Sequence, residues 1–251
     1  MYRKDRTPAT ERQVLGSHRV WNAAYHGVGV KKVPRPRAND ISELTTRRLA
    51  VYLRCLGVLQ AAGIGSVSSK EIAEQFHLNS AQFRKDLAYF GEFGVRGVGY
   101  RVGDLKNHLV QILGLDREVR LAIIGAGHLG LALAGYEGFN QESFRVAGLF
   151  DSDPEKIGTT TRQGIAVQDI GTLPDIAKRE SIDIAVLAVP VTAGQEVLDL
   201  VAVAGIQAVL NFVPARLKVP PSIKLKTVDL KVQVEALVYQ LNLVRGDAQA
   251  G

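Results

Sequence analysis

The spacing of apolar residues differs between the two halves of this chain. From Leu121 onward, short apolar runs such as residues 121–124 and 146–150 alternate with segments whose apolar residues recur every three or four positions. Short apolar runs indicate buried strands, and the longer period indicates helices. Strands that alternate with helices predict an α/β fold, a doubly wound parallel sheet, in the second half.

The first half shows only the helical period between about residues 41 and 90. One helix is predicted to run to about Ala62, followed by a break at Gly63. Its apolar residues fall on one face: Leu44, Leu49, Tyr52, Leu53, Leu56 and Leu59. Ser68 and Glu71 have the spacing of a capping box, which predicts that a second helix begins there.

A short turn at residues 77–79 precedes a third helix, predicted from Ala81 to Phe90 and capped by Asn79 or Ser80. Two short helices separated by three or four residues are typical of a helix-turn-helix, here at about residues 51–90. The third helix would carry polar and basic residues away from its apolar face. The residues expected to contact DNA in this region are Ser69, Lys70, Ser80, Gln82, Arg84, Lys85 and Tyr89. The alternative is that Arg84 and Lys85 belong to an ordinary solvated helix face.

Glycines at positions 91, 94, 97 and 99 follow this helix. Residues 93–100 alternate apolar residues across the glycines, which predicts a small hairpin at about residues 91–100 with Arg96 near its tip. A basic hairpin after such a helix is a wing, and Arg96 is placed to enter a DNA minor groove. We therefore expect an N-terminal winged helix-turn-helix domain.

A glycine motif follows the first apolar strand of the second half. It comprises Gly125, Ala126, Gly127, His128, Leu129 and Gly130. The first glycine permits a tight turn, the second lets backbone N–H groups approach a pyrophosphate, and the third lets the next helix pack closely on the sheet. The start of that helix is also electrostatically suited to phosphate. The spacing predicts a Rossmann dinucleotide-binding domain.

Asp151 ends the next apolar run, 21 residues after Gly130. An acid at this distance accepts hydrogen bonds from the adenosine ribose, and its charge repels a 2′-phosphate. The expected cofactor is therefore NADH/NAD⁺ rather than the phosphorylated form.

Charge is unevenly distributed over the 251 residues, whose formal net charge is +6. Residues 1–119 carry a net charge of +8 and residues 120–251 a net charge of −2. A basic half suggests a polyanionic partner, although an ordinary solvated surface has the same composition. The single cysteine, Cys55, fits a reducing compartment, and no apolar run reaches the roughly 18 residues of a membrane span. No secretory signal is recognised, so we expect a cytoplasmic protein with no membrane association.

These patterns predict four segments. Residues 1–39 form a basic, disordered tail, and residues 40–118 form the winged-helix DNA-binding domain with a linker helix. Residues 119–230 form the Rossmann NAD(H)-binding domain, and residues 231–251 form a C-terminal helix and tail.

Several segments together resemble the Rex family of redox-sensing transcriptional repressors, over about residues 40–245. The matching segments are SSKEIAE at 68–74, QFRKDLAYFGEFGVRGVGY at 82–100, ILGLD at 112–116, GAGHLG at 125–130, YEGF at 136–139, FDSDPEKIG at 150–158, NFVP at 211–214 and VDL at 228–230. His128 departs from the family, which often has asparagine there. The histidine does not change the expected binding of a dinucleotide, because such a loop binds phosphate mainly through backbone N–H groups.

The resemblance implies a homodimeric repressor that binds pseudo-palindromic double-stranded DNA operators of respiratory and fermentative genes when NADH is low. NADH binding would release it. It also implies an exchanged C-terminal dimerisation helix at about residues 231–245, a segment too apolar for an isolated surface helix. The alternative is that this helix packs on its own sheet.

The resemblance also places Tyr136 and Asp229, with Val189 and Pro190, among the cofactor-binding residues. We hypothesise that Tyr136 and Asp229 hydrogen-bond in the NADH-bound state, and that NAD⁺ frees Asp229 to pair with a basic residue such as Arg54. The alternative is that Tyr136 packs at the end of its helix and Arg54 is solvated.

Two other functions compete with the repressor. A dehydrogenase with an added helical domain would need an acid or base beside the nicotinamide, and no such arrangement stands out, so no enzyme activity is expected. A DNA-binding protein whose Rossmann domain takes another ligand stays open. The histidines and Cys55 lack metal-ligand spacing, so no metal is expected.

Overall fold

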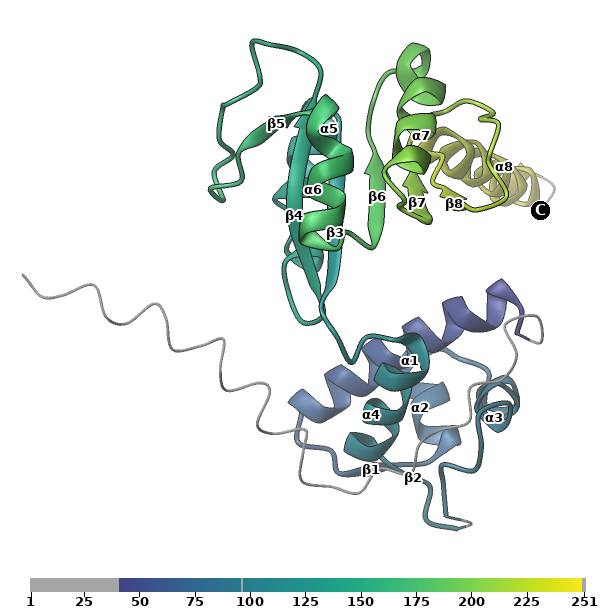
Figure 1. The fold of residues 1–251 in the computed structure, drawn as a ribbon. Helices are drawn as coiled ribbons and strands as arrows, with labels where there is room; N and C mark the ends of the chain where they lie inside the picture. Colours follow the sequence, from purple (N-terminus) through teal and green to yellow (C-terminus); the bar gives the residue numbers. More distant parts are fainter. Residues whose placement is uncertain (1–40, 96, 250–251) are drawn as a thin grey trace, which may run out of the picture. The chain divides into compact units, whose positions relative to one another are not determined.

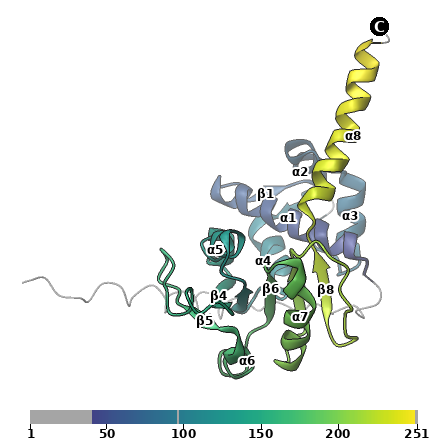
Figure 2. The same ribbon diagram turned by 90° about the horizontal axis from the view of Figure 1, so that it is seen from above.

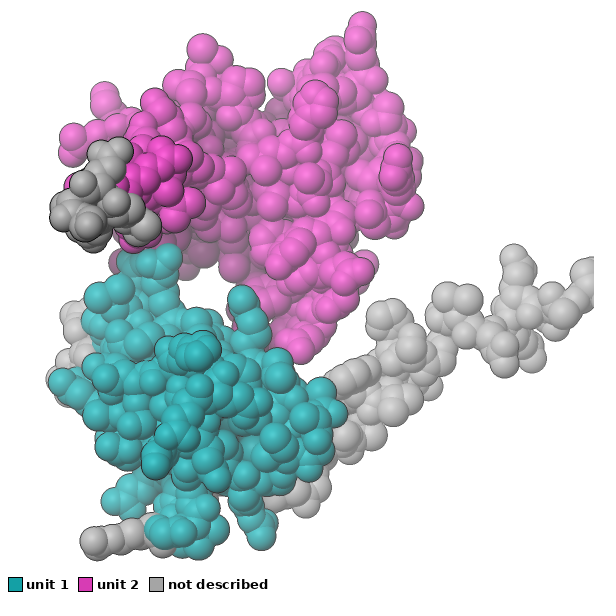
Figure 3. Space-filling view, turned by 180° about the vertical axis from the view of Figure 1, so that it is seen from behind, with its two compact units in different colours: residues 1–113 teal, residues 114–251 magenta. Residues whose placement is uncertain are grey.

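A computed structural model describes residues 41–95 and 97–249 of the chain. The chain divides into two compact units, residues 1–113 and 114–251 (Figure 3). The predicted tail at residues 1–39 and the predicted wing-tip residue Arg96 lie outside the described residues.

Unit 1 is a small helical domain with a short two-stranded sheet (Figure 1). Its elements are α1 Glu43–Ala61, β1 Ser66–Val67, α2 Ser69–Phe76, α3 Ser80–Ala88, β2 Tyr100–Arg101 and α4 Val102–Leu113. The helix-turn-helix predicted from the sequence is formed by α2 and α3. Its core joins α1, α3 and α4 through buried Leu56, Phe83 and Leu105.

The helix boundaries follow from local hydrogen bonds. The Ser68 hydroxyl accepts from the Glu71 N–H, and the Glu71 carboxylate accepts from the Ser68 N–H, so the predicted capping box is confirmed. The Asn79 side chain accepts from the Gln82 N–H, so Asn79 is the cap of α3. Between the helices, His77 takes the left-handed conformation, with φ at 53°, which ends α2.

Two sequence predictions in this unit need correction. Leu44 is exposed, because the buried face of α1 passes through Thr45 one position later. The predicted third helix ends at Ala88, two residues earlier than expected, although Phe90 is buried as its apolar character suggests.

The wing is built differently from a simple hairpin. Val95 and Gly99 form a bridge that closes a tight turn, and β2 then pairs with β1, with Val67 opposite Tyr100. A side chain at Gly99 would press on the Val67 carbonyl, and Gly99 has φ of +92°. The glycine therefore lets the second strand of the wing lie directly against β1, which the sequence pattern did not reveal.

Unit 2 is a six-stranded sheet in which every pair of neighbours is parallel. Its elements are β3 Val119–Ile124, α5 His128–Ala134, η2 Glu137–Phe139, β4 Phe144–Asp151, β5 Val167–Asp169, η3 Ile170–Thr172, α6 Leu173–Glu180, β6 Ile184–Leu187, η4 Val191–Ala193, α7 Gly194–Val203, β7 Ala208–Asn211, β8 Lys224–Thr227 and α8 Leu230–Gln249. The strand order is β5-β4-β3-β6-β7-β8. This is the order of a dinucleotide-binding Rossmann sheet, so the predicted fold is confirmed.

Alternate residues of the central strands face two separate cores. Ile123 of β3 packs with Ala134 of α5 on one side of the sheet. Ile124 packs with Leu173 of α6 and Leu198 of α7 on the other side. Buried residues on both faces are what a parallel sheet covered by helices requires.

The last helix, α8, extends away from the sheet of its own unit (Figure 2). Its large apolar side chains are exposed: Leu230, Val232, Val234, Leu237, Val238, Tyr239, Leu241 and Leu243. The alternative that α8 packs on its own sheet is therefore wrong. Across the described residues, no helix combines the length and apolar character needed to cross a membrane.

Candidate functional sites

The turn from β3 into α5 shows why glycine stands at each motif position. Gly125 has φ of +104°, and a side chain there would press on the Ala188 carbonyl. A side chain at Gly130 would collide with the Gly125 carbonyl, so only glycine lets α5 pack this close to β3. A Cβ at Gly127 would meet nothing within 4 Å. The open space at Gly127 fits a site where a ligand approaches the backbone.

Asp151 ends β4 beside this turn and holds the loop in place. Its Oδ2 accepts from the Ala126 N–H at 2.7 Å, and its Oδ1 accepts from the Asp153 N–H at 2.9 Å. Burial opposes ionisation of this carboxyl, but these bonds and the nearby Lys156 outweigh burial and lower its pKa. Asp151 is therefore an ionised carboxylate, which suits it to accept from ribose hydroxyls.

A lysine also contacts this acid, which the motif alone does not predict. Lys156 Nζ lies 3.2 Å from Asp151 Oδ2 and 3.4 Å from Asp153 Oδ2. The charge that repels a 2′-phosphate is thus partly balanced by a cation. Lysine five residues after the strand-ending acid is the sequence signal that was overlooked.

Val189 and Pro190 follow β6, which is the neighbour of β3 on the side opposite β4. A Cβ at Gly125 would lie 3.0 Å from Val189 Cγ1, so these residues line the same end of the sheet as the glycine turn. The connection that leaves β3 leads to β4 on one side, whereas the connection that leaves β6 leads to β7 on the other side. Such a switch point at the carboxyl ends of parallel strands is where open α/β sheets bind ligands.

Tyr136 and Asp229, the two residues of the hypothesised switch, each have other partners in the structure. Tyr136 is 56% exposed and packs edge-on against Phe139, 5.2 Å between ring centres. The Asp229 carboxylate accepts from the N–H groups of Lys231 and Val232 and so caps the start of α8. Within the described residues no hydrogen bond joins Tyr136 to Asp229. Arg54 is exposed on α1 in the other unit.

The predicted DNA-contacting residues cluster on α2 and α3. The Arg84 guanidinium donates to the Ser69 hydroxyl at 2.9 Å, so these two positions are brought together. Lys70 pairs with Glu74 on the same helix at 3.7 Å. Lys85 is exposed on α3, whose first residue is Ser80, and Tyr89 is exposed directly after the helix ends. The exposed face of α3 is therefore basic, as a recognition helix requires.

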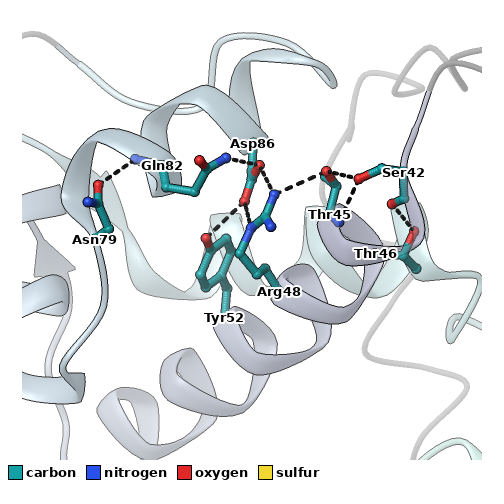
Figure 4. Close-up of polar contacts among 8 residues, drawn as sticks. All are labelled: Ser42, Thr45, Thr46, Arg48, Tyr52, Asn79, Gln82 and Asp86. Atoms are coloured by element: carbon teal, nitrogen blue, oxygen red, sulfur yellow. Dashed lines mark hydrogen bonds and ion pairs between the residues drawn. The ribbon is translucent and has the colours of Figure 1, made fainter.

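Gln82 differs from these residues because its side chain is hydrogen-bonded to a buried carboxylate, that of Asp86 (Figure 4). Its Nε2 donates to Asp86 Oδ1 at 2.7 Å. Arg48 of α1 donates to both Asp86 oxygens, with Nε to Oδ2 at 2.5 Å and Nη2 to Oδ1 at 2.7 Å. The Tyr52 hydroxyl donates to Oδ2 at 2.9 Å. Four donors thus reach the carboxylate of Asp86, whose exposed fraction is 0%.

The charge of Asp86 follows from these partners. Burial opposes ionisation, but hydrogen bonds from Arg48, Gln82 and Tyr52 and the charge of Arg48 lower the pKa of the carboxyl. Burial and the hydrogen bond to Asp86 raise the pKa of Tyr52 to about 12. The network, which we call the Asp86 cluster (Arg48, Tyr52, Gln82 and Asp86), ties α3 to α1. Sequence reasoning missed it.

Among the described residues, no group of three or more His, Cys, Asp or Glu side chains has the arrangement of a metal site. Cys55 is buried in the core of unit 1, where burial raises the pKa of its thiol. It therefore serves as a small packing residue.

Comparisons with known proteins bear on both units. A family model described as "Putative DNA-binding protein N-terminus" matches residues 40–88, and one described as "CoA binding domain" matches residues 116–215. The first range lies in unit 1 and the second in unit 2. The matches agree with a DNA-binding unit followed by a nucleotide-binding one.

Curated relatives cover most of the chain. The redox-sensing transcriptional repressor Rex of Desulfitobacterium hafniense is 45% identical over 82% of this chain and 97% of its own length. That of Pelotomaculum thermopropionicum is 45% identical over 86% of this chain and all of its own length. These relatives are regulators rather than enzymes, which confirms the expectation of no enzyme activity.

Solved structures agree with the relatives. RSP in complex with β-NAD⁺ and operator DNA has a TM-score of 0.77 and 37% identity, over 83% of this chain and 96% of its own. RSP with β-NADH has a TM-score of 0.74 and 36% identity, over 84% of this chain and 99% of its own. RSP is described as a Rex-family repressor. On these relationships, and on the two units described above, the chain belongs to the Rex family of redox-sensing transcriptional repressors.

Proposed function

We propose that this protein binds operator DNA through unit 1 and is released from it when NADH binds unit 2. One observation carries the proposal: a basic recognition helix and a preformed dinucleotide turn, with the ionised Asp151, occur in one chain. The solved relatives in complex with operator DNA, NAD⁺ and NADH support it. The protein would then act in the cytoplasm, on genes of respiration and fermentation.

Unit 2 supplies a site that fits NAD(H). Ala126 is anchored to Asp151, so the loop is already ordered. The N–H groups of Gly127, His128 and Leu129, at the start of α5, are the ones suited to the pyrophosphate. Asp151 would hold the adenosine ribose, and Val189 and Pro190 would line the cofactor beyond it.

Unit 1 supplies the contacts to DNA. Arg84 and Lys85 of α3, with Ser69 and Lys70 of α2, would meet phosphates or base edges. Gln82 also lies on α3, and Tyr89 is the residue directly after it. Basic groups near the start of a recognition helix reach the major groove, and a wing reaches the adjacent backbone or minor groove. Arg96 keeps its predicted role at the wing tip.

A second copy of the chain would complete the assembly. The exposed apolar side chains of α8 form a surface of the kind that obligate dimers bury. Exchange of α8 between two copies would cover it. A two-fold dimer also matches a pseudo-palindromic operator, whose half-sites are related by the same symmetry.

Tyr136 and Asp229 would read the oxidation state. The nicotinamide carries a positive charge in NAD⁺ and none in NADH, so only groups that respond to that charge distinguish the two forms. Tyr136 is exposed enough to turn toward Asp229, and the bonds that cap α8 both use Oδ1 of Asp229 rather than Oδ2. Asp229 paired with Tyr136 would mark the NADH state, and Asp229 paired with Arg54 the DNA-binding state.

The deciding experiment has two stages. Duplexes that the full chain prefers are first selected from a random library, which supplies an operator sequence. Fluorescence anisotropy of that duplex is then followed while NADH and NAD⁺ are titrated separately at one salt concentration. We expect release by NADH and not by NAD⁺, with Tyr136→Phe and Asp229→Ala each weakening the response to NADH.

Three outcomes contradict parts of the proposal. If the selection returns no preferred duplex, the proposal that the protein is a repressor is refuted. Binding that ignores both cofactors would leave a DNA-binding protein with a different ligand. A normal NADH response in both the Tyr136 and the Asp229 variants would refute the role of these two residues in the response, but not the response to NADH itself.

A further inference from the structure

The Asp86 cluster determines which way the Gln82 amide points. A carboxylate can only accept hydrogen bonds, and Asp86 is ionised because its partners lower its pKa. The nitrogen of Gln82 therefore has to face Asp86, and the amide oxygen Oε1 has to face away (Figure 4). The reversed amide would set Oε1 against Oδ1 of the carboxylate, which is repulsive.

The carboxylate itself cannot turn to accommodate a reversed amide. Arg48 binds it through two parallel hydrogen bonds from α1, and Tyr52 donates to the oxygen that Gln82 leaves free. Paired bonds of this kind fix the plane of a carboxylate as well as its position. The orientation of Gln82 is therefore set from a different helix, across the domain core.

The outward-facing oxygen of Gln82 is open to solvent. Among the described residues, the Gln82 side chain makes one hydrogen bond, which Nε2 donates to Asp86. Across the residues that the structure describes, no buried side-chain oxygen or nitrogen lacks a partner, so the unpaired Oε1 must reach the surface. Nε2 also keeps a second hydrogen, because an amide nitrogen carries two.

Gln82 stands at the third position of α3, in the first turn of the recognition helix. Residues at the start of such a helix contact base edges in the major groove. An amide oxygen that accepts beside an N–H that donates matches adenine, whose N6 amino group donates and whose N7 accepts. Guanine presents two acceptors there and does not match this arrangement.

We propose that Gln82 reads one adenine in each operator half-site, and that Asp86 is the positioning residue that keeps its amide oxygen outward. The inference rests on the proposed DNA-binding function. It assigns Gln82 a base contact and Arg48, Tyr52 and Asp86 a role in specificity without touching DNA.

The test uses the full-length protein and the selected operator. Each adenine is replaced in turn by purine, which lacks the N6 amino group, and by 7-deazaadenine, which lacks N7. At one adenine per half-site we expect the unaltered protein to lose about tenfold in affinity with each analogue. Gln82→Ala should show no loss at that position, whereas the matched control Gln75→Ala, exposed on α2, should behave as the unaltered protein.

Asp86→Asn tests the positioning role. An asparagine amide accepts or donates, so both orientations of Gln82 become allowed, and repeated selection should return mixed bases at that same position. A purely structural role would lower affinity for all duplexes and leave the base preference unchanged. Circular dichroism checks that the variant folds, and if it does not, the Gln82→Ala result decides the base contact.

The outcomes distinguish a failure of this inference from a failure of the proposed function on which it rests. If the unaltered protein selects no sequence, the proposed function fails and the inference fails with it. If it selects an operator but Gln82→Ala weakens every duplex alike, only the inference is overturned. Loss of preference at a base other than adenine also overturns it.

Discussion

Replacing Asp86 with alanine removes the acceptor from three side chains at once. The Arg48 guanidinium loses both of its paired bonds, and the buried Tyr52 hydroxyl loses its hydrogen bond to Asp86. Breaking a buried ion pair from one side costs about 3–5 kcal/mol, because the other charge is left unpaired. The Arg48 side chain is 34% exposed, so water solvates part of its unpaired charge and reduces this cost. We therefore expect the free energy of unfolding to fall by about 3 kcal/mol.

Removing the other polar groups should restore most of that stability. Arg48→Met added to Asp86→Ala eliminates the unpaired charge. The Tyr52 hydroxyl is then the buried group without its acceptor, worth about 1–3 kcal/mol when unsatisfied, whereas the Gln82 amide is only half-buried. Tyr52→Phe removes that buried hydroxyl. We expect the triple variant to lie within about 1 kcal/mol of the unaltered protein, since apolar replacements of buried ion pairs are often close to neutral.

Hydrogen exchange of the backbone amides in α1 and α3 is the assay, because it reports the opening of unit 1 separately from unit 2. The slowest amides of these helices should lose about 3 kcal/mol of protection in Asp86→Ala and regain it in the triple variant. A single variant within about 0.5 kcal/mol of the unaltered protein, as for an ordinary surface substitution, would refute the reasoning. So would a triple variant as unstable as the single one.

The pH dependence of the same amides gives a second check. The pKa of Asp86 is lower in the folded state, so its contribution is present above the unfolded value near 4 and is lost as the pH falls below it. The pKa of Tyr52 is raised to about 12, so its contribution is present below pH 10 and is lost between pH 10 and 12. The triple variant should show neither change.

Three further predictions concern unit 2. Gly130→Ala should destabilise the unit by about 1–3 kcal/mol in thermal denaturation, because the new methyl group collides with the Gly125 carbonyl, whereas Gly127→Ala should fold normally and weaken NADH binding; equal melting temperatures for the two would contradict this. Lys156→Met should increase the preference for NADH over NADPH several-fold in fluorescence titrations, because the acid it pairs with loses its counter-charge, and Lys178→Met on α6 serves as the unchanged control. Leu237→Asp on α8 should shift the protein from dimer to monomer in sedimentation velocity; an unchanged dimer would place the interface elsewhere.

The dinucleotide turn could be predicted from the sequence because its signals are local. Gly125, Gly127 and Gly130 stand at fixed spacing after one strand, and each meets a steric demand of that single turn. Asp151 follows at the distance of one strand-helix-strand unit. The doubly wound parallel sheet could be predicted as well, because parallel strands joined by helices allow few arrangements.

The pairing of the wing with β1 and the Asp86 cluster could not be predicted in the same way, because they join distant residues. Val67 pairs with Tyr100, and Asp86 bonds Arg48, 38 positions earlier. In the sequence, Asp86 follows Arg84 and Lys85 and looks like part of a charged, solvated face. One signal was present: Asp86 falls between Phe83 and Leu87 on the apolar side of α3. A charge at such a position requires partners, although the sequence alone does not name them.

Stability alone does not explain why unit 1 carries the Asp86 cluster. If the triple apolar variant is as stable as the unaltered protein, the cluster contributes little net free energy to folding, and its function has to be sought elsewhere. Apolar side chains cannot fix the orientation of the Gln82 amide. Only a fixed hydrogen-bond acceptor keeps the nitrogen of Gln82 inward and its oxygen outward. The triple variant should therefore fold, bind DNA and lose its preference for adenine at one position. A variant that folds and keeps the preference would show that Gln82 is oriented by the DNA rather than by Asp86.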